Sequence, residues 1–300
     1  MKKLTIKDWV LATRPWSFPA TALPTLVALL FTIYSNPYGE NNWLFGVLAI
    51  IGAVIFHAAG NVMSDYNDFK HDIDREGNVV GTDMLTGGFF TPKQFLVLGW
   101  TLLLIGVLLG LFLVWQTSLT LLWIGLFGTF ATLFYFRFKV AALGDLLIFV
   151  VYGPLIMLGT GYVVSGKLDF YLLLLSLSLV PITVAILHGN NTRDMENDRT
   201  AGIDTLAMLL GIGGSKIYYY FLTGLAYVAI IALVALGKLP LFALITLLTL
   251  PLAIKNCKMV AKVTENDKSS VTTIDQETAK LQMVFSMALM VAIVLGTMWK

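Results

Sequence analysis

The sequence predicts an all-α, polytopic integral membrane protein with nine transmembrane helices in one bundle. Hydrophobic residues make up 57% of the 300 residues and charged residues only 13%, whereas soluble domains average about 25% charged. The apolar residues fall in runs long enough to cross a bilayer. Several runs are joined by very short links, such as Gln116–Ser118 and Gly237–Pro240, which predict antiparallel neighbours.

The first apolar run follows Lys2 and Lys3, as in a signal peptide, but it carries Pro19 and Pro24 and similar runs follow it. We therefore expect a membrane helix there. The nine runs fall at about 17–34, 43–63, 95–115, 117–136, 141–164, 169–188, 216–236, 239–255 and 281–299. No soluble stretch divides them, so residues 1–300 are expected to form a single transmembrane domain.

The basic residues predict the orientation. Of the 20 Lys and Arg residues, 17 lie before the first run or in the links on that same side, and only three lie opposite. The positive-inside rule then places the N-terminus in the cytoplasm and the C-terminus outside. We expect a multi-pass protein of the cell (inner or plasma) membrane. The clean alternation of charge also supports the count of nine runs.

The most polar stretch is residues 188–206, HGNNTRDMENDRTAGIDTL. Asn190, Asp194 and Asp198 recur every four residues, so on a helix they share one face. Carboxylate and amide oxygens are the ligands that Mg²⁺ takes in proteins, often together with phosphate oxygens. Arg193 lies beside them and suits a bidentate phosphate contact. This stretch predicts a magnesium–phosphate site.

A similar stretch lies upstream at residues 61–74, NVMSDYNDFKHDID. Asn61, Asp65, Asp68 and Asp72 are spaced by four, three and four residues and form one helical stripe. The stripe would run about 16 Å along a continuous helix, which is too long for one metal ion. Either two metal ions bind here or Asp72 lies beyond the helix end.

Both polar stretches follow runs that end on the cytoplasmic side. We therefore expect cytoplasmic cap loops at about 65–94 and 189–215, which glycines such as Gly87, Gly88 and Gly211 make adaptable enough to form a lid. These loops would lie at the mouth of the bundle, directly above its apolar interior.

Two polar, acidic helix faces above an apolar interior predict a polyprenyl diphosphate as substrate. Its diphosphate head would lie at the cytoplasmic rim and its hydrocarbon tail inside the bundle. Metal ions and cationic side chains neutralise a leaving diphosphate. The allylic carbocation left behind is stabilised by aromatic faces and protected by excluding water. An electron-rich aromatic carbon then attacks it. Tyr135 and Tyr152 are candidates to face this carbocation because they lie near the cytoplasmic ends of their runs.

Several separated stretches resemble one family. Residues 190–211 closely resemble the second signature of the UbiA superfamily of membrane prenyltransferases, and residues 64–74 resemble the first. Residues 12–30 resemble the entry to its first helix. Residues 135–145 and 152–166 look like the basic loop and fifth helix of the branch that prenylates 1,4-dihydroxy-2-naphthoate in menaquinone biosynthesis. The resemblance implies a Mg²⁺-dependent transferase whose acceptor loses its carboxylate as the prenyl group is attached.

The resemblance also assigns site residues by position. It places metal-binding carboxylates at Asp65, Asp68 and Asp72 of the first motif and at Asp194 and Asp198 of the second. All but Asp72 are the expected catalytic residues. Two amides beside the metal and three diphosphate-binding cations complete the expected site: Asn190, Asn191, Arg137, Lys139 and Arg193.

The chain departs from the family pattern at Ser64, where Asn is usual. Either Asn61, one turn earlier on the same face, takes that role, or Ser64 binds through water. Among the remaining residues, His57 and His188 are expected to be hydrogen-bonded packing residues, because neither has a second His at ligand spacing. Arg14 is either an interfacial anchor or a substrate contact. The Gly153-Pro154 pair predicts a helix kink.

Two alternatives remain open at the level of the sequence. Acidic residues in a helical bundle also suit a cation-coupled transporter, although transport sites lie near the bilayer midplane and these carboxylates gather at one rim. Within the enzyme class, the acceptor is alternatively 4-hydroxybenzoate, homogentisate or chlorophyllide. The expected partners are the prenyl diphosphate, the aromatic acceptor and the lipid bilayer, and nucleic acid is not expected.

Overall fold

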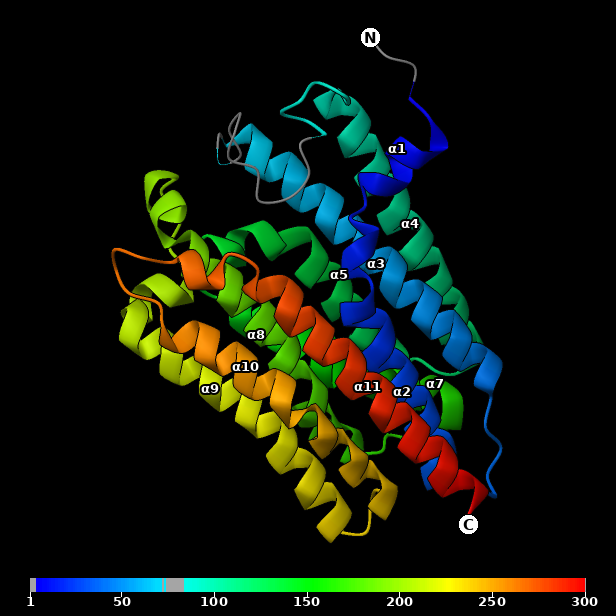
Figure 1. Cartoon of the computed structure of the whole chain (residues 1–300). Coiled ribbons are helices and arrows are strands. Elements are labelled where there is room, and N and C mark those ends of the chain that lie inside the picture. The colour runs from blue at the N-terminus through cyan, green and yellow to red at the C-terminus, as the bar shows by residue number, and fades with distance from the viewer. Residues whose placement is uncertain (1–3, 72, 74–83, 300) are drawn as a thin grey trace.

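The computed structural model describes residues 4–71, 73 and 84–299. Within them, nine helical segments are long and apolar enough to cross a membrane. The segments lie side by side in one bundle with the two chain termini at opposite ends (Figure 1). An odd number of crossings places the two termini on opposite sides of a membrane, as the sequence predicts.

The elements follow one another in this order: α1 (Ile6–Leu11), η1 (Pro15–Ser17), α2 (Pro19–Ser35), α3 (Trp43–Lys70), α4 (Pro92–Gln116), α5 (Thr120–Lys139), α6 (Gly144–Val150), η2 (Val151–Leu155), α7 (Ile156–Ser165), α8 (Tyr171–Thr200), α9 (Leu206–Ala235), η3 (Leu241–Thr249), α10 (Leu250–Ala261), η4 (Ser269–Val271) and α11 (Ile274–Met298). Here η2 is a π-helical turn and the other η elements are 3₁₀ helices. Chain segments α6, η2 and α7 together make the fifth crossing, and η3 with α10 makes the eighth.

Local sequence explains where several helices begin. The hydroxyl of Thr91 accepts from the backbone of Gln94, whose side chain accepts from the Thr91 backbone in return. This capping box satisfies amide groups that the first helical turn leaves unpaired. The hydroxyl of Thr205 caps α9 by accepting from the Met208 amide. The start of α9 is therefore fixed at Leu206, ten residues before the apolar run that predicted it.

The expected cap loop at 189–215 is consequently wrong. Helix α8 continues through the polar motif to Thr200, and α9 begins at Leu206, so a short connection replaces the predicted loop. Within this motif Asn190, Asp194 and Asp198 line one side of a cavity and remain part of the helix. Gly211, with φ 63° and ψ 177°, breaks the helical path inside α9. At the other expected cap loop, α3 runs to Lys70, and residues 72 and 74–83 lie outside the described residues.

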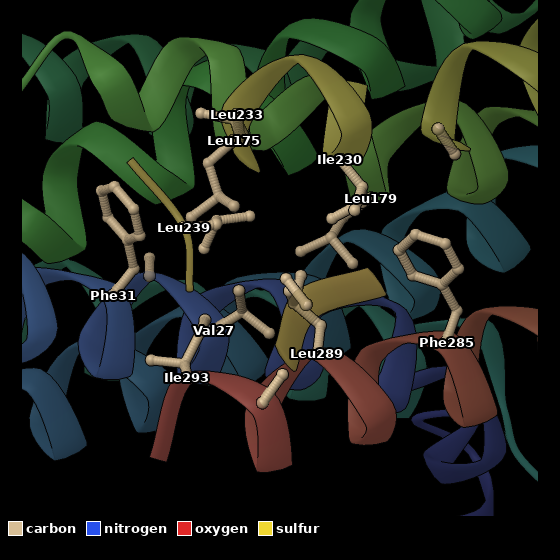
Figure 2. Close-up of a cluster of buried hydrophobic side chains, with 14 of the residues drawn as sticks. Val27, Phe31, Leu175, Leu179, Ile230, Leu233, Leu239, Phe285, Leu289 and Ile293 are labelled. Atoms are coloured by element: carbon tan, nitrogen blue, oxygen red, sulfur yellow. The ribbon is translucent and has the colours of Figure 1, made fainter. Parts of the chain in front are cut away.

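The largest buried apolar cluster joins α2, α8, α9 and α11. Phe31, Leu175, Ile230 and Phe285 belong to it and are each at most 1% exposed. Their side chains meet between the helices in Figure 2. Burial of such side chains stabilises by about 1.5–3 kcal/mol each. The cluster therefore holds α8, which carries the second polar motif, against the N-terminal and C-terminal helices.

The fifth crossing is irregular at Gly153 and Pro154, as the sequence predicted. The π-helical turn η2 contains both residues. Such turns are usual where proline interrupts a helix. A Cβ atom at Gly153 would lie 2.8 Å from Cγ1 of Val180, so the glycine allows η2 to pack closely on α8. The turn also carries Tyr152, which lines a cavity between α3, α5 and α8.

Candidate functional site

A cavity of about 430 Å³ lies between α3, α4, α5, α7 and α8. Its lining on α3 extends from Ala49 to Asp68, which corresponds to about 28 Å of helix. That length approaches the hydrocarbon thickness of a bilayer, about 30 Å. Apolar side chains and glycines line most of it, and charged side chains gather at one end. The cavity therefore suits an elongated molecule with a polar head.

The polar end of this cavity brings both sequence motifs together. We refer to its side chains as the rim, and they come from the N-terminal segment, α3, α5 and α8: Arg14, Asn61, Ser64, Asp68, Tyr135, Lys139, Asn190, Asn191, Asp194 and Asp198. Seven of the expected site residues are thus among the rim residues. The remaining expected residues are Asp65, Asp72, Arg137 and Arg193.

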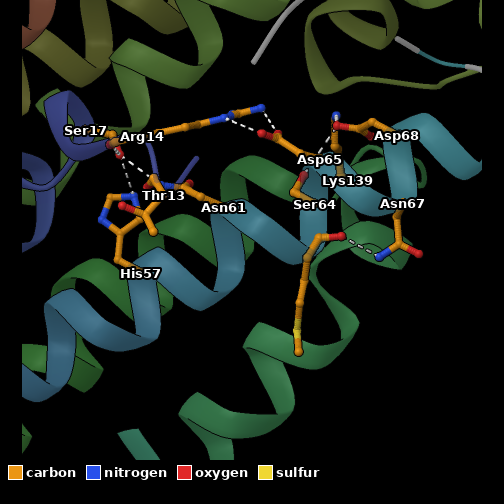
Figure 3. A network of polar contacts seen from close by, with 11 residues as sticks. Thr13, Arg14, Ser17, His57, Asn61, Ser64, Asp65, Asn67, Asp68 and Lys139 are labelled. Atoms are coloured by element: carbon orange, nitrogen blue, oxygen red, sulfur yellow. Dashed lines mark hydrogen bonds and ion pairs between the residues drawn. The ribbon is translucent and has the colours of Figure 1, made fainter. Parts of the chain in front are cut away.

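Two ion pairs connect the first motif to cations from elsewhere in the chain. The ammonium of Lys139 lies 2.7 Å from Oδ2 of Asp68, and the guanidinium of Arg14 pairs with both oxygens of Asp65, which lies buried behind the rim. Figure 3 shows the two pairs side by side along α3. The Ser64 hydroxyl also donates to Asp68 Oδ2 at 3.4 Å. These contacts compensate buried carboxylate charge, which is costly to leave alone.

Arg14 reaches Asp65 from an unusual backbone conformation. Its φ of 57° and ψ of 58° lie in the left-handed region, which costs a non-glycine residue of order 1–3 kcal/mol. Such strain is found at functional sites more often than elsewhere. The sequence left Arg14 between two roles, and the structure places it at the rim.

The second motif has its own cation. Nε and Nη2 of Arg193 each donate to one oxygen of Asp194 at 2.8 Å, a bidentate pair. Nη1 of Arg193 also reaches Asp275 on α11 at 3.2 Å. Arg193 is not among the rim residues, so it fixes the Asp194 carboxylate from behind. Asp198, one turn further along α8, lies in the rim itself.

Lys139 and Arg137 are separated by the structure. They are two residues apart at the end of α5, so they point to nearly opposite sides of the helix. Lys139 lines the cavity, whereas Arg137 is exposed and does not. Arg137 is therefore not part of the candidate site, contrary to what the resemblance implied. After Lys139 the chain is tied to the second motif, because the amide of Ala142 donates to the carbonyl of Asp204 at 2.8 Å.

Two rim oxygens are available to a cation. Oδ1 of Asp68 and Oδ1 of Asn190 are both buried and accept no hydrogen bond from any described residue. Hard oxygen atoms of this kind fit Mg²⁺. No group of three or more His, Cys, Asp or Glu side chains is poised for a metal within residues 4–71, 73 and 84–299. A magnesium ion here would therefore take amide and phosphate oxygens as well. Asp72, an expected ligand, lies outside the described residues.

Two histidines have more elaborate surroundings than the sequence indicated. His57 is hydrogen-bonded through both ring nitrogens and also lines the cavity. His188 is fully buried and pairs with Asp145, which is 1% exposed. Sequence reasoning did not single out Asp145. The available signal was a carboxylate beside an apolar run, because intramembrane ionisable residues are rare and commonly functional.

The fold and the cavity define a multi-pass membrane protein with a long apolar cavity that is polar and charged at one end. The model of the UbiA prenyltransferase family matches residues 21–274. This covers most of the chain, which therefore belongs to the UbiA prenyltransferase family. The protein is accordingly a transferase of prenyl groups, and the expectation of an enzyme is confirmed.

Relatives of known family agree with this assignment. The chain is 35% identical over 294 residues to UbiA prenyltransferase domain-containing protein 1 of Xenopus tropicalis, covering 96% of this chain and 82% of that one. The human protein of the same name is 35% identical over 227 residues, covering 74% and 66%.

Two archaeal structures share the fold. A UbiA homolog from Aeropyrum pernix K1 superposes with a TM-score of 0.70 at 16% identity, covering 96% of this chain and 99% of that one. A homolog from Archaeoglobus fulgidus bound to DMAPP and Mg²⁺ gives 0.63 at 13% identity, covering 95% and 99%. The predicted all-α membrane fold with nine long apolar helices is thereby confirmed.

Proposed function

We propose that this protein transfers a polyprenyl group from a polyprenyl diphosphate to 1,4-dihydroxy-2-naphthoate, the aromatic precursor in menaquinone biosynthesis. The observation that carries the proposal is the meeting of both acidic motifs at one end of a long apolar cavity. The acceptor is supported by the resemblance of residues 135–145, 152–166 and 190–211 to the menaquinone branch of the family. The position of the charged side chains argues against a cation transporter. They gather at one end of the cavity, and no charged side chain lies along the rest of its described lining.

The rim provides binding groups for a diphosphate and for Mg²⁺. Oxygens of Asp68, Asn190, Asp194 and Asp198 would hold the metal, which supplies positive charge to the diphosphate oxygens when bound. The A. fulgidus homolog is described as bound to DMAPP and Mg²⁺, which supports the same requirement here. The ammonium of Lys139 adds a positive charge to the rim that does not depend on a bound metal ion.

The reaction breaks the bond between C1 of the prenyl chain and the diphosphate oxygen. The diphosphate leaves with the electron pair, and the Lys139 ammonium stabilises the negative charge that develops. The remaining allylic cation faces Tyr135 and Tyr152, which line the cavity close to the rim. The apolar walls exclude the water that would quench it. A ring carbon of the acceptor then donates its π electrons to form the new bond, and loss of CO₂ returns an electron pair to the ring.

We also propose that the rim opens on the cytoplasmic side of the cell membrane. The support is the distribution of charge, with 17 of 20 Lys and Arg residues on the side where α3 and α8 end. A soluble acceptor and a diphosphate product are then exchanged directly with the cytosol, while the prenyl tail enters from the membrane.

The test uses the purified full-length chain with Mg²⁺ and radiolabelled geranyl, farnesyl or longer diphosphates. Each donor is paired with one aromatic acceptor, and diphosphate release and prenylated product are both measured. We expect product with dihydroxynaphthoate and none after Asp194→Ala. Diphosphate release at the wild-type rate in Asp194→Ala would refute the site. Product with only 4-hydroxybenzoate, homogentisate or chlorophyllide would refute the acceptor, and cation flux in liposomes without turnover would refute the reaction.

A further inference from the structure

A hydrogen-bond network fixes the side-chain amide of Asn61 on α3. Its Nδ2 donates to the backbone carbonyl of Thr13 at 3.0 Å and to Oγ of Ser17 at 3.0 Å. A backbone carbonyl only accepts, so the amide nitrogen must face the N-terminal segment, as Figure 3 shows. The carbonyl oxygen is the remaining polar atom of this cavity-lining side chain.

His57 fixes the hydroxyl on which Asn61 depends. Ser17 Oγ donates its single hydrogen to the carbonyl of Arg14 at 2.8 Å. It must therefore accept both from Asn61 and from Nε2 of His57, which lies 3.2 Å away. Nδ1 of His57 then accepts from the hydroxyl of Thr21 at 2.5 Å. Every hydrogen in this network has one assignable acceptor, so the amide of Asn61 cannot turn over without breaking it.

A second network fixes Asn191 on α8 in the same way. Oδ2 of Asp145 accepts from Nδ1 of His188 at 3.0 Å, and Oδ1 of Asp145 accepts from Nδ2 of Asn191 at 3.4 Å. Asn191 therefore presents its amide nitrogen to Asp145. Asp145 and His188 are 1% and 0% exposed and lie outside the cavity lining, whereas Asn191 lines the cavity.

The two networks are alike although their residues are far apart in the sequence. In each, a histidine anchors an acceptor, and that acceptor holds the amide nitrogen of an asparagine from one of the two polar motifs. A reversed amide would present its N–H groups to a cation and repel it. We propose that these networks hold the carbonyl oxygens of Asn61 and Asn191 toward the cavity as ligands of the cation–diphosphate complex.

The inference rests on the proposed function, because it presupposes a divalent cation and a diphosphate at the rim. It makes Ser17, Asp145 and His188 positioning residues that act only through the two asparagines. Residues that hydrogen-bond to a metal ligand raise metal affinity by holding that ligand in one orientation, and their loss weakens metal binding by about 10–100-fold. The predicted effect is therefore on the binding of the cation itself, in addition to turnover.

The experiment measures Mn²⁺ binding to the purified full-length chain in the presence of inorganic pyrophosphate, from the electron paramagnetic resonance signal of free Mn²⁺. We expect Asp145→Leu and His188→Leu to raise the Kd for Mn²⁺ by about 10–100-fold. His188→Asn returns an N–H group near the position of Nδ1 and should restore the Kd to within a few-fold of wild type. Ser17→Ala removes one acceptor of Asn61 and should weaken binding independently.

Tyr219→Phe is the matched control, since it removes a buried hydrogen bond to Thr278 of 2.6 Å outside the cavity lining. It should lower thermal stability while leaving Mn²⁺ binding unchanged. If the leucine variants fail to fold, Mn²⁺ binding is measured instead on Asp145→Asn, which keeps the side-chain size, and on Ser17→Ala. Wild-type affinity in both variants would overturn this inference and leave the proposed function standing. A wild-type chain that binds no Mn²⁺ with pyrophosphate would overturn the proposed function as well.

Discussion

Replacing Lys139 with Met tests which cation assists departure of the diphosphate. Met has a similar length and keeps the apolar contacts of the side chain, so the change removes mainly the charge. Lys139 is 22% exposed and its partner Asp68 only 3%. The substitution leaves the Asp68 carboxylate buried without its ammonium, which costs about 3–5 kcal/mol when such a pair is broken. We expect about 3 kcal/mol of stability to be lost, because Lys139 is partly solvated.

The expected effect on catalysis is separate from this loss. Removing one preorganised charge or donor at a site of developing negative charge typically lowers kcat by about 10²–10³, or about 2.7–4 kcal/mol. The double variant Asp68→Asn/Lys139→Met removes both partners and should recover most of the stability. It should not recover activity, because the ammonium and a metal-binding carboxylate are then both missing. Thermal unfolding and diphosphate release, measured on the same preparations, distinguish the two effects.

Arg137→Met is the matched control for this experiment. It removes one positive charge from the same last turn of α5, at an exposed position outside the cavity. Exposed substitutions change free energies by about 0.5 kcal/mol or less, so activity should stay within about twofold. Equal losses in Arg137→Met and Lys139→Met, or full activity in Lys139→Met, would refute the assignment of the leaving-group cation.

Three further outcomes follow. Treatment with EDTA should abolish product formation and added Mg²⁺ should restore it, whereas activity that survives EDTA would exclude a divalent cation from the reaction. Gly128→Phe should shorten the longest prenyl diphosphate accepted, because Gly128 lines the cavity about 16 Å before Lys139 along α5; an unchanged product series would contradict this. Gly296→Ala should lower the thermal midpoint, since its Cβ would meet the rigid ring of Pro240 at 2.6 Å, while Gly224→Ala, with open space, should not; equal midpoints would contradict the packing.

Much of the fold could be predicted because hydropathy depends on local composition. The apolar runs located all nine crossings, and the count of basic residues predicted their alternation. Hydropathy misplaces the end of α8 and the start of α9, because a run of polar residues ends the apolar pattern without ending the helix. In α8, Asn190, Asp194 and Asp198 stay helical since they face a cavity, and Thr205 begins α9 by capping it. Hydropathy alone cannot separate a polar helix from a polar loop.

The candidate site could be predicted only as far as residue spacing allows. The three- and four-residue intervals in the two motifs predict that Asp68 and Asp194 lie on polar helix faces, and the structure brings both to one rim. Spacing could not separate Lys139 from Arg137, because tertiary packing decides which side of α5 faces inward. Nor could it pair Asp145 with His188, which are 43 residues apart in the chain and meet only through the packing of α6 on α8.

The central claim is that the two acidic motifs share one diphosphate. Anomalous diffraction from crystals grown with Mn²⁺ and a non-hydrolysable farnesyl thiodiphosphate measures this directly. Manganese peaks lying between the carboxylates of Asp68 and Asp194, with the diphosphate touching both sites, are the predicted result. Metal bound to one motif alone, or a diphosphate lodged elsewhere on the protein, would contradict it.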